Sequence, residues 1–188
     1  YKTDESKIRL IHRCVNMENF NVETTSAERM IKYLEDNNIP EDKPIVTLIG
    51  RLTNWKGQKL LIEALHLIDN EDFFCVIIGD DQGRKKYSSE LRKMIANYNM
   101  TDRFLFIRNV KDIPAAMMVS DVVLSTSIEP EAFGRIAIEG QAMGRVVVAS
   151  NIGGSVETVI DGVTGRLYES TSVQALAEAI DWALHLST

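Results

Sequence analysis

The sequence is poor in cysteine, proline and long apolar runs, and each shortage excludes a class of protein. Two cysteines in 188 residues, Cys14 and Cys75, are too few for a disulfide scaffold, so free thiols in a reducing, cytoplasmic compartment are expected. Four prolines and eleven glycines exclude collagen-like and low-complexity chains. No apolar run approaches the roughly 18 residues of a membrane span. The start, Tyr1–Lys7, has no apolar signal-peptide stretch and no initiator methionine, so we expect part of a longer protein.

Positive charge is also scarce, because 21 lysines and arginines face 27 acidic residues for a net charge of −6. Nucleic-acid binding depends on cationic surface, so this balance argues against a nucleic-acid partner. A phosphate-bearing ligand would therefore need a local basic cluster. With 45% hydrophobic and 26% charged residues, the composition is that of a globular protein able to bury the core of one domain.

Short, β-branched apolar runs alternate with helical segments along the chain. The runs are continuous rather than alternating, as expected of strands buried on both faces. They are Ile8–Ile11, Ile45–Ile49, Phe73–Ile78, Phe104–Ile107, Val122–Leu124 and Val146–Ala149. Apolar stripes at helical spacing lie at 60–68, 91–98, 136–143 and 173–180, the last with Ser172 as the expected N-cap. This alternation predicts an α/β fold, a Rossmann-like, doubly wound parallel sheet.

A polar, turn-rich break at 35–44 divides the chain. We expect a linker strand and helical annex over 1–43 and a Rossmann-like domain over 44–188. In an open parallel sheet, ligands bind outside the carboxyl ends of the strands. Loops that directly follow strands are therefore the places to look for functional side chains.

The loop Gly50–Gly57 follows the run Ile45–Ile49 and carries Arg51 and Lys56. An arginine can grip a phosphate through two donors, and a lysine adds a compact point charge. Together they could neutralise a diphosphate. The alternative is an ordinary solvated basic loop.

The segment that follows Val122–Leu124 carries two acidic residues, Glu131 and Glu139. Gly134 is expected to open the next helix, whose free N–H groups and dipole attract anions. Glu131 would then lie before the helix and Glu139 on it. A carboxylate beside a sugar can accept two hydroxyl hydrogen bonds. The alternative is that both are surface glutamates, although Glu139 stands in a mostly apolar stretch.

Two further loops give weaker signals. The pair Gly153 and Gly154 could let the backbone approach a ligand closely, or could form only a turn. Asn109 and Val110, after Phe104–Ile107, could offer an apolar wall and backbone hydrogen bonds to a nucleobase, or could be an ordinary loop. The three histidines have no metal-ligand spacing and no metal-binding carboxylate pair is found, so no metal is predicted.

Taken together, these motifs resemble the donor-binding, C-terminal half of GT-B glycosyltransferases of family 4 (group 1). Gly50–Gly57 resembles the family pattern G-R-L-x-x-x-K-G. Glu131–Glu139 resembles E-x(7)-E with its central Phe-Gly, and Gly153–Gly165 resembles G-G-x-x-E-x-x-x-D-G-x-T-G. The resemblance covers about residues 44 to 170. Ile8–Phe20 resembles the interdomain segment more loosely.

The resemblance implies a role for each matched residue. Arg51 and Lys56 would hold the donor diphosphate and Glu131 would contact the transferred sugar, which makes these three the catalytic residues. The substrate-binding residues would be Gly50 in the diphosphate loop, Glu139 at the ribose, the backbone of Phe133, Gly134 and Arg135 at the phosphate and sugar, and Asn109 and Val110 at the base. Asn109 replaces a common glycine, so base preference does not carry over.

The reaction implied is retaining, metal-independent transfer from a UDP- or GDP-linked sugar, with no cofactor. The acceptor, a glycan or a lipid-linked glycan, would be bound mainly by an N-terminal lobe outside this chain, so the chain alone should transfer little. That lobe could make peripheral contact with the inner face of the membrane. The segment that carries Gln141 and Arg145 resembles the corresponding segment of bacterial lipopolysaccharide and envelope enzymes of the family. The alternatives are a non-catalytic nucleotide-sugar-binding module, which need not keep Arg51, Lys56 and Glu131 together, and a GT-B sugar-nucleotide epimerase.

Overall fold

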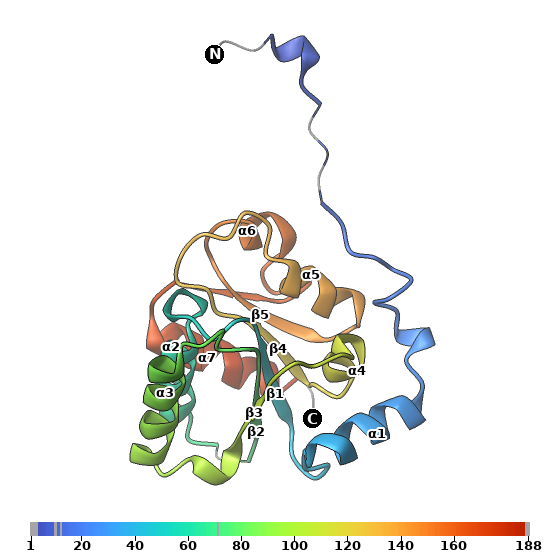
Figure 1. The fold of residues 1–188 in the computed structure, drawn as a ribbon. Coiled ribbons are helices and arrows are strands. Elements are labelled where there is room, and N and C mark those ends of the chain that lie inside the picture. The colour runs from blue at the N-terminus through green and yellow to red at the C-terminus, as the bar shows by residue number, and fades with distance from the viewer. Residues whose placement is uncertain (1–3, 10, 12, 71, 187–188) are drawn as a thin grey trace.

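The computed structural model describes residues 4–9, 11, 13–70 and 72–186, and the strands of these residues form one sheet (Figure 1). The strands are β1 (Ile45–Ile49), β2 (Phe74–Ile78), β3 (Phe104–Ile107), β4 (Val122–Ser125), β5 (Val146–Ser150) and β6 (Arg166–Tyr168). They lie in the order β3-β2-β1-β4-β5-β6, and neighbouring strands are parallel. This order confirms the predicted Rossmann-like fold and places the topological switch point between β1 and β4.

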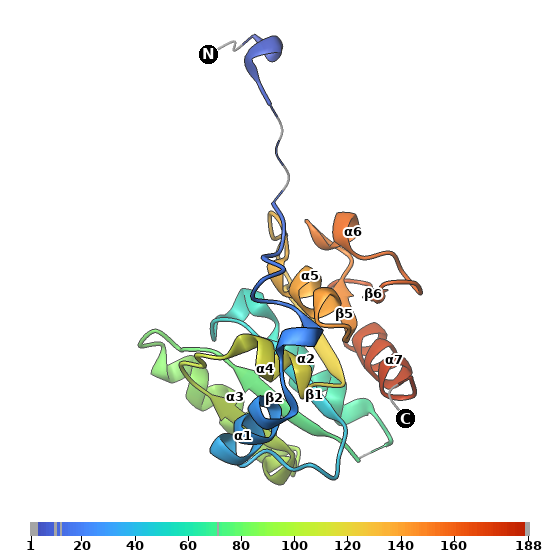
Figure 2. The same ribbon diagram turned by 90° about the vertical axis from the view of Figure 1, so that its right-hand side faces the viewer.

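Helices cover both faces of the sheet (Figures 1 and 2). One layer comprises α2 (Gln58–Leu67), α3 (Lys85–Asn97) and α7 (Val173–Leu184), and the other comprises α1 (Ala27–Asn37), α4 (Ile113–Met118) and α5 (Arg135–Ala142). A short helix, α6 (Ser155–Thr158), lies beside α5. Short 3₁₀ turns occur at Glu5–Lys7, Val22–Thr24, Asn54–Lys56 and Thr101–Arg103.

The two faces of the sheet carry two apolar clusters, and β1 shows how one strand serves both. Val46 and Leu48 belong to the cluster under α2 and α7, whereas Ile45 and Ile49 belong to the cluster under α4 and α5. Successive side chains of a strand point to opposite faces, so a continuous apolar run is needed where both faces are covered.

Two helices begin at the residues that the sequence predicted. The Ser172 hydroxyl accepts the N–H of Ala175 at 3.2 Å and caps α7, as predicted. Gly134 is the N-cap of α5, also as predicted, with φ +70° in the left-handed region that favours glycine.

The predicted strand at Ile8–Ile11 is wrong for its described residues, Ile8, Arg9 and Ile11, while Leu10 lies outside them. Ile8 and Ile11 expose 54% and 85% of their surface. They lie on the extended N-terminal arm, away from the sheet (Figure 1). A β-branched run forms a strand only where a neighbouring strand supplies hydrogen bonds, and the arm has none beside it.

The edge strand β6 was not predicted from the sequence. It has only three residues, Arg166–Tyr168, and pairs with β5 through the register Ala149 to Leu167. So short a segment with one aliphatic residue carries no strand periodicity, and its pairing depends on the β5 edge beside it.

The helical part of the segment before residue 44 packs into the same body as the rest. α1 contacts α4, and Tyr33 and Ile39 are buried in the cluster under α4 and α5. Cys14 is exposed and Cys75 is buried, and both are free thiols. Within the described residues, no helix has the length and apolar character needed to cross a membrane.

Candidate functional site

A cavity of about 550 Å³ lies at the carboxyl ends of β1 and β4. This is the switch point of the sheet, where the loops that follow two adjacent strands diverge to opposite faces and leave a crevice. Its lining consists of Arg13, Ile49, Gly50, Arg51, Trp55, Lys56, Glu131, Ala132, Phe133, Gly134, Arg135 and Ile136. Seven of the ten site residues predicted from sequence are therefore brought together: Gly50, Arg51, Lys56, Glu131, Phe133, Gly134 and Arg135.

The loop after β1 presents its two cations around an aromatic ring. The Lys56 Nζ lies 4.5 Å from the ring centroid of Trp55, and the Arg51 guanidinium carbon lies 5.7 Å from it. Such cation–π contacts restrict the two flexible side chains. The Thr126 hydroxyl, in the loop after β4, donates to the Lys56 carbonyl at 2.9 Å and ties the two loops together.

Gly57 is required for that approach. Its φ is +73°, and a Cβ there would lie 2.0 Å from the Thr126 carbonyl oxygen. No other residue could adopt the turn and leave room for the neighbouring loop.

Lys56 and Glu131 form an ion pair inside the cavity, with 2.5 Å between Nζ and Oε1. The Ser127 hydroxyl donates to the same carboxylate oxygen. The side chains of Lys56 and Glu131 are 14% and 21% exposed, so the pair is largely screened from water yet lines the cavity. An anionic ligand that reaches Lys56 must therefore share it with Glu131.

The start of α5 faces the cavity through Phe133, Gly134 and Arg135. The first N–H groups of a helix have no partner within it, and the helix dipole adds partial positive charge there. The cavity is thus lined by two cations and by a helix N-terminus, a combination suited to phosphate groups.

Glu139 lies farther along α5 and is outside the cavity lining. It is 5% exposed, and Arg135 Nε donates to its Oε1 at 3.0 Å. Burial raises the pKa of Glu139, and the attraction and hydrogen bond of Arg135 oppose that rise. Arg135 links this buried carboxylate to the cavity, because Arg135 does line it.

The glycine pair after β5 supports the loop of Glu131. A Cβ on Gly153 would lie 2.5 Å from the Glu131 carbonyl oxygen, and one on Gly154 would lie 2.5 Å from the Phe133 Cα. The Gly154 N–H donates to the Glu131 carbonyl at 2.7 Å. These glycines therefore let the loop after β5 pack closely against the backbone of the loop that carries Glu131.

Asn109 and Val110 also lie outside the cavity lining, in the loop after β3. Asn109 is exposed and has φ +53°, a left-handed conformation that asparagine tolerates better than most residues. Val110 is half-buried and packs on the cluster under α4 and α5.

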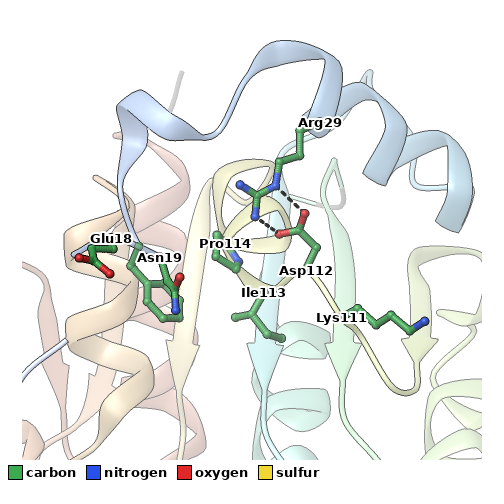
Figure 3. A pocket seen from close by; sticks show the side chains of 8 residues that line it. Glu18, Asn19, Arg29, Lys111, Asp112, Ile113 and Pro114 are labelled. Atoms are coloured by element: carbon green, nitrogen blue, oxygen red, sulfur yellow. Dashed lines mark hydrogen bonds and ion pairs between the residues drawn. The ribbon is translucent and has the colours of Figure 1, made fainter. Parts of the chain in front are cut away.

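A second pocket, of about 320 Å³, lies where the N-terminal arm and α1 meet the start of α4 (Figure 3). Figure 3 shows Arg29 reaching from α1 to Asp112, with Nε–Oδ2 and Nη2–Oδ1 distances of 2.5 and 2.6 Å. Asp112 also accepts the Ala115 N–H at 3.0 Å and so caps α4. The hydrogen bonds from Arg29 lower the pKa of Asp112, against the effect of burial. This pair fixes the loop that begins at Asn109.

Sequence reasoning missed three residues of the main site: Trp55, Ser127 and Arg13. Trp55 stands inside the basic loop, so an aromatic side chain between two cations was an available signal. Ser127 precedes Glu131 by four residues in a loop and has no periodic signature. Arg13 had no signal, because its segment was assigned to a linker. Among the described residues, no group of three histidine, cysteine or acidic side chains is arranged to hold a metal ion.

Comparison with known proteins identifies one family, described as glycosyl transferases group 1, which matches residues 30–187. The chain is 38% identical to a glycosyltransferase from Rickettsia africae ESF-5 of known crystal structure, with a TM-score of 0.93 over 97% of this chain and 48% of that one. It is 30% identical to Anabaena Alr3699/HepE, solved in complex with UDP and glucose, with a TM-score of 0.86 over 96% of this chain and 48% of that one.

A curated relative gives a third comparison. The chain is 30% identical over 149 residues to a GDP-mannose-dependent alpha-(1-6)-phosphatidylinositol monomannoside mannosyltransferase of Mycolicibacterium smegmatis. The match covers 74% of this chain and 38% of that protein. The chain thus spans about half, or less, of the length of these relatives.

Proposed function

This chain belongs to the glycosyl transferases of group 1, and we propose that it is the donor-binding half of an enzyme that transfers a sugar from a nucleotide sugar. The observation that carries the proposal is the cavity at the switch point, where Arg51, Lys56, Glu131 and the start of α5 meet. Nucleotide ligands bind at this place in open α/β sheets.

The electrostatics of the cavity suit the departure of a nucleoside diphosphate. Breaking the bond between sugar and phosphate builds negative charge on the leaving oxygen. In the proposed role, Arg51, Lys56 and the N–H groups at Gly134 and Arg135 lie where that charge develops, and Glu131 faces the transferred sugar. Removing one preorganised group of this kind typically lowers a rate by about 10²–10³.

Two finer features belong to the proposal: retention of configuration at the anomeric carbon, and independence of divalent metal. Both are implied by the family resemblance, and the second is supported by the two cations and the helix N-terminus, which supply positive charge to the diphosphate. Nuclear magnetic resonance of the fresh product would report its anomeric configuration. Activity that persists in excess chelator would support metal independence, and activity restored only by Mg²⁺ or Mn²⁺ would contradict it.

Glu139 completes the proposed donor site by accepting hydrogen bonds from the ribose hydroxyls, with Arg135 between it and the cavity. The base is proposed to contact the loop of Asn109 and Val110. The similar proteins include one named as GDP-mannose-dependent and one solved with UDP, so both bases are proposed. The acceptor, a glycan or glycolipid, and any membrane contact are assigned to a further lobe, because the relatives are about twice as long.

Calorimetry and thermal melting of this chain with UDP and GDP test the proposal. Ligand at 100 times its dissociation constant should stabilise the fold by about 2.7 kcal/mol. Arg51→Ala and Glu139→Ala should each weaken binding by about tenfold or more, whereas Lys32→Ala, an exposed cation on α1, should leave it unchanged. If neither nucleotide binds at millimolar concentration, the assignment of the site is wrong.

A further inference from the structure

A third pocket, of about 320 Å³, lies at the carboxyl ends of β2 and β3, on the side of α3. It shares no lining residue with the donor cavity. The residues that carry the argument are Lys85, Ser88, Arg92 and Arg108, and Asp81 and Phe106 also line the pocket. None of its lining residues has been assigned a role in the proposed donor binding.

Three cations face this one pocket in a chain whose net charge is −6. Lys85, Ser88 and Arg92 are spaced three and four residues apart on α3, so they share one face of the helix. Arg108 joins them from the end of β3. The helix and the strand thus contribute donors from two sides.

The acidic residue of the pocket is already engaged. Asp81 is 3% exposed, forms an ion pair with Arg108, and accepts the Gly83 N–H at 3.0 Å. Its charge is therefore neutralised, and it holds the Arg108 guanidinium in place. A buried carboxylate with these partners positions a cation for a ligand more than it repels an anion.

Arg92 is held in another way. Its guanidinium carbon lies 4.4 Å from the ring centroid of Phe106, so the ring orients it without neutralising it. Within the part of the chain that the structure describes, no ion pair joins Arg92 or Lys85 to a carboxylate. Two uncompensated charges therefore face one small pocket.

We propose that this pocket binds a phosphate monoester group, carried either by a soluble phosphorylated compound or by a lipid headgroup. Arginine matches phosphate through paired donors, lysine adds a point charge, and the Ser88 hydroxyl adds a donor. The pocket is also adjacent to the loop after β1, Gly50–Gly57, which carries Arg51 and Lys56. Leu52 lines it, and the Leu52 N–H donates to the Asp80 carbonyl at 3.0 Å.

The first test is calorimetric titration of this chain with inorganic phosphate and with glycerol 3-phosphate. The titrations are made in the background Arg51→Ala/Lys56→Ala, so that the donor cavity cannot contribute. Adding Lys85→Gln/Arg92→Gln should weaken binding by at least about tenfold. Because this background removes the proposed donor site, the result is independent of whether the proposed function holds.

A matched control is Lys86→Gln/Lys93→Gln, which removes two cations from the same helix and leaves the pocket lining intact. All four substituted side chains of α3 are exposed, so both double variants should melt at the same temperature as the Arg51→Ala/Lys56→Ala parent. Equal weakening in the two double variants would show general attraction to a basic surface and would overturn the proposal.

Vesicles distinguish the two sources of the phosphate group. Sedimentation with phosphatidic acid in phosphatidylcholine is compared with pure phosphatidylcholine. Binding of the soluble probes that Lys85→Gln/Arg92→Gln removes indicates a soluble ligand. Binding only to phosphatidic acid vesicles, removed by the same variant and kept by Lys86→Gln/Lys93→Gln, indicates a lipid headgroup. Binding of none of these probes overturns the proposal.

Discussion

Lys56 has two kinds of partner in the proposed donor cavity at the switch point, the carboxylate of Glu131 and the ring of Trp55. The carboxylate neutralises the ammonium group, whereas the ring only orients it. A bound diphosphate would compete with Glu131 for the same charge. At the scale of single residues, the resting ion pair therefore opposes diphosphate binding while it keeps Lys56 in place.

Replacing Glu131 with glutamine should tighten binding of UDP or GDP by about fivefold or more, because the competing pair is largely screened from water and is worth more than the roughly 1 kcal/mol of an exposed pair. Sugar transfer by the two-lobed enzyme should fall at the same time, since the proposed contact with the sugar is lost. Glu129→Gln removes an exposed acid of the same loop and serves as the control. Weaker binding in Glu131→Gln would contradict this account of Lys56.

Glu139 illustrates a conflict between stability and ligand binding. Its pKa in the folded protein is raised by burial, so the folded state holds the proton more tightly than the unfolded state. Its contribution to stability is therefore full below the ordinary value of 4.5 and is lost as the pH rises through the raised value. At neutral pH the ionised group weakens the fold.

Glu139→Gln should therefore raise the melting temperature at pH 7 and flatten its decline between acid and neutral pH. The same substitution should weaken binding of UDP or GDP by about tenfold or more, since the proposed bonds to the ribose lose their charge. Melting curves across pH and calorimetry measure the two effects. Glu35→Gln, an exposed acid of α1, should change neither.

At the scale of elements, the loops that follow the strands are held by contacts with one another. Gly153 and Gly162 share a left-handed backbone, with φ +59° and +72°, but differ in surroundings. A Cβ on Gly153 would strike the backbone of Glu131, whereas a Cβ on Gly162 would meet no atom within 4 Å. The two positions separate the cost of backbone strain from the cost of displacing the site loop.

Gly162→Ala should lower the free energy of unfolding by about 1–2 kcal/mol, the cost of a left-handed alanine. Gly153→Ala should lower it by about a further 1–3 kcal/mol from overpacking, and should also weaken nucleotide binding because Glu131 shifts. Chemical denaturation and calorimetry measure these effects. Equal losses in the two variants would show that the close contact with Glu131 is unimportant.

Asp112 joins three elements, because it caps α4, pairs with Arg29 of α1 and belongs to the loop after β3. Its lowered pKa means that its contribution to stability is present above its ordinary value of 3.8 and is lost as the pH falls through the lowered value. The ion pair is about one-third exposed, so solvent screens part of its effect.

Asp112→Ala should therefore lower the free energy of unfolding by about 1–2 kcal/mol at pH 7, mostly through the lost helix cap. Asp36→Ala removes an exposed acid paired with Lys32 and should cost about 0.5 kcal/mol or less. The difference between the two variants should shrink as the pH falls toward 3. A constant difference would exclude titration of Asp112 as its cause.

At the scale of the whole molecule, the chain contains one lobe and spans about half of the length of the relatives compared above. The cavity at the switch point is proposed to bind the donor diphosphate, and the acceptor is assigned to a further lobe. We therefore predict nucleotide binding with little transfer by the chain alone. Fusing the N-terminal half of the Rickettsia africae glycosyltransferase to this chain should restore transfer from a UDP- or GDP-sugar to its acceptor.

Two outcomes of that fusion would contradict the proposed sugar transfer. Donor binding with no transfer, in a fusion that folds, would favour the non-catalytic binding module. Formation of an epimerised nucleotide sugar without acceptor would favour the epimerase. The Arg51→Ala fusion is the control for transfer that does not depend on the donor cavity.

Much of the proposed donor site could be predicted from the sequence, because its signals are local. The basic loop at Arg51 and Lys56 and the glycine at the start of α5 occur in short motifs, and each motif follows a strand. Trp55 could have been included on the same grounds. The role of Asn109 stays a prediction: its left-handed backbone suits the loop, and the loop lies outside the lining of the cavity at the switch point.

The sequence by itself determined five of the six strands, most of the helices and the motifs, because apolar periodicity and turn residues act over a few neighbours along the chain. Only the tertiary structure decided which distant groups meet. Lys56 pairs with Glu131 across 75 residues and Arg29 with Asp112 across 83. These contacts exist because β4 lies beside β1 and α1 packs on α4, and the order of strands in a sheet is set by packing between segments that no local pattern encodes.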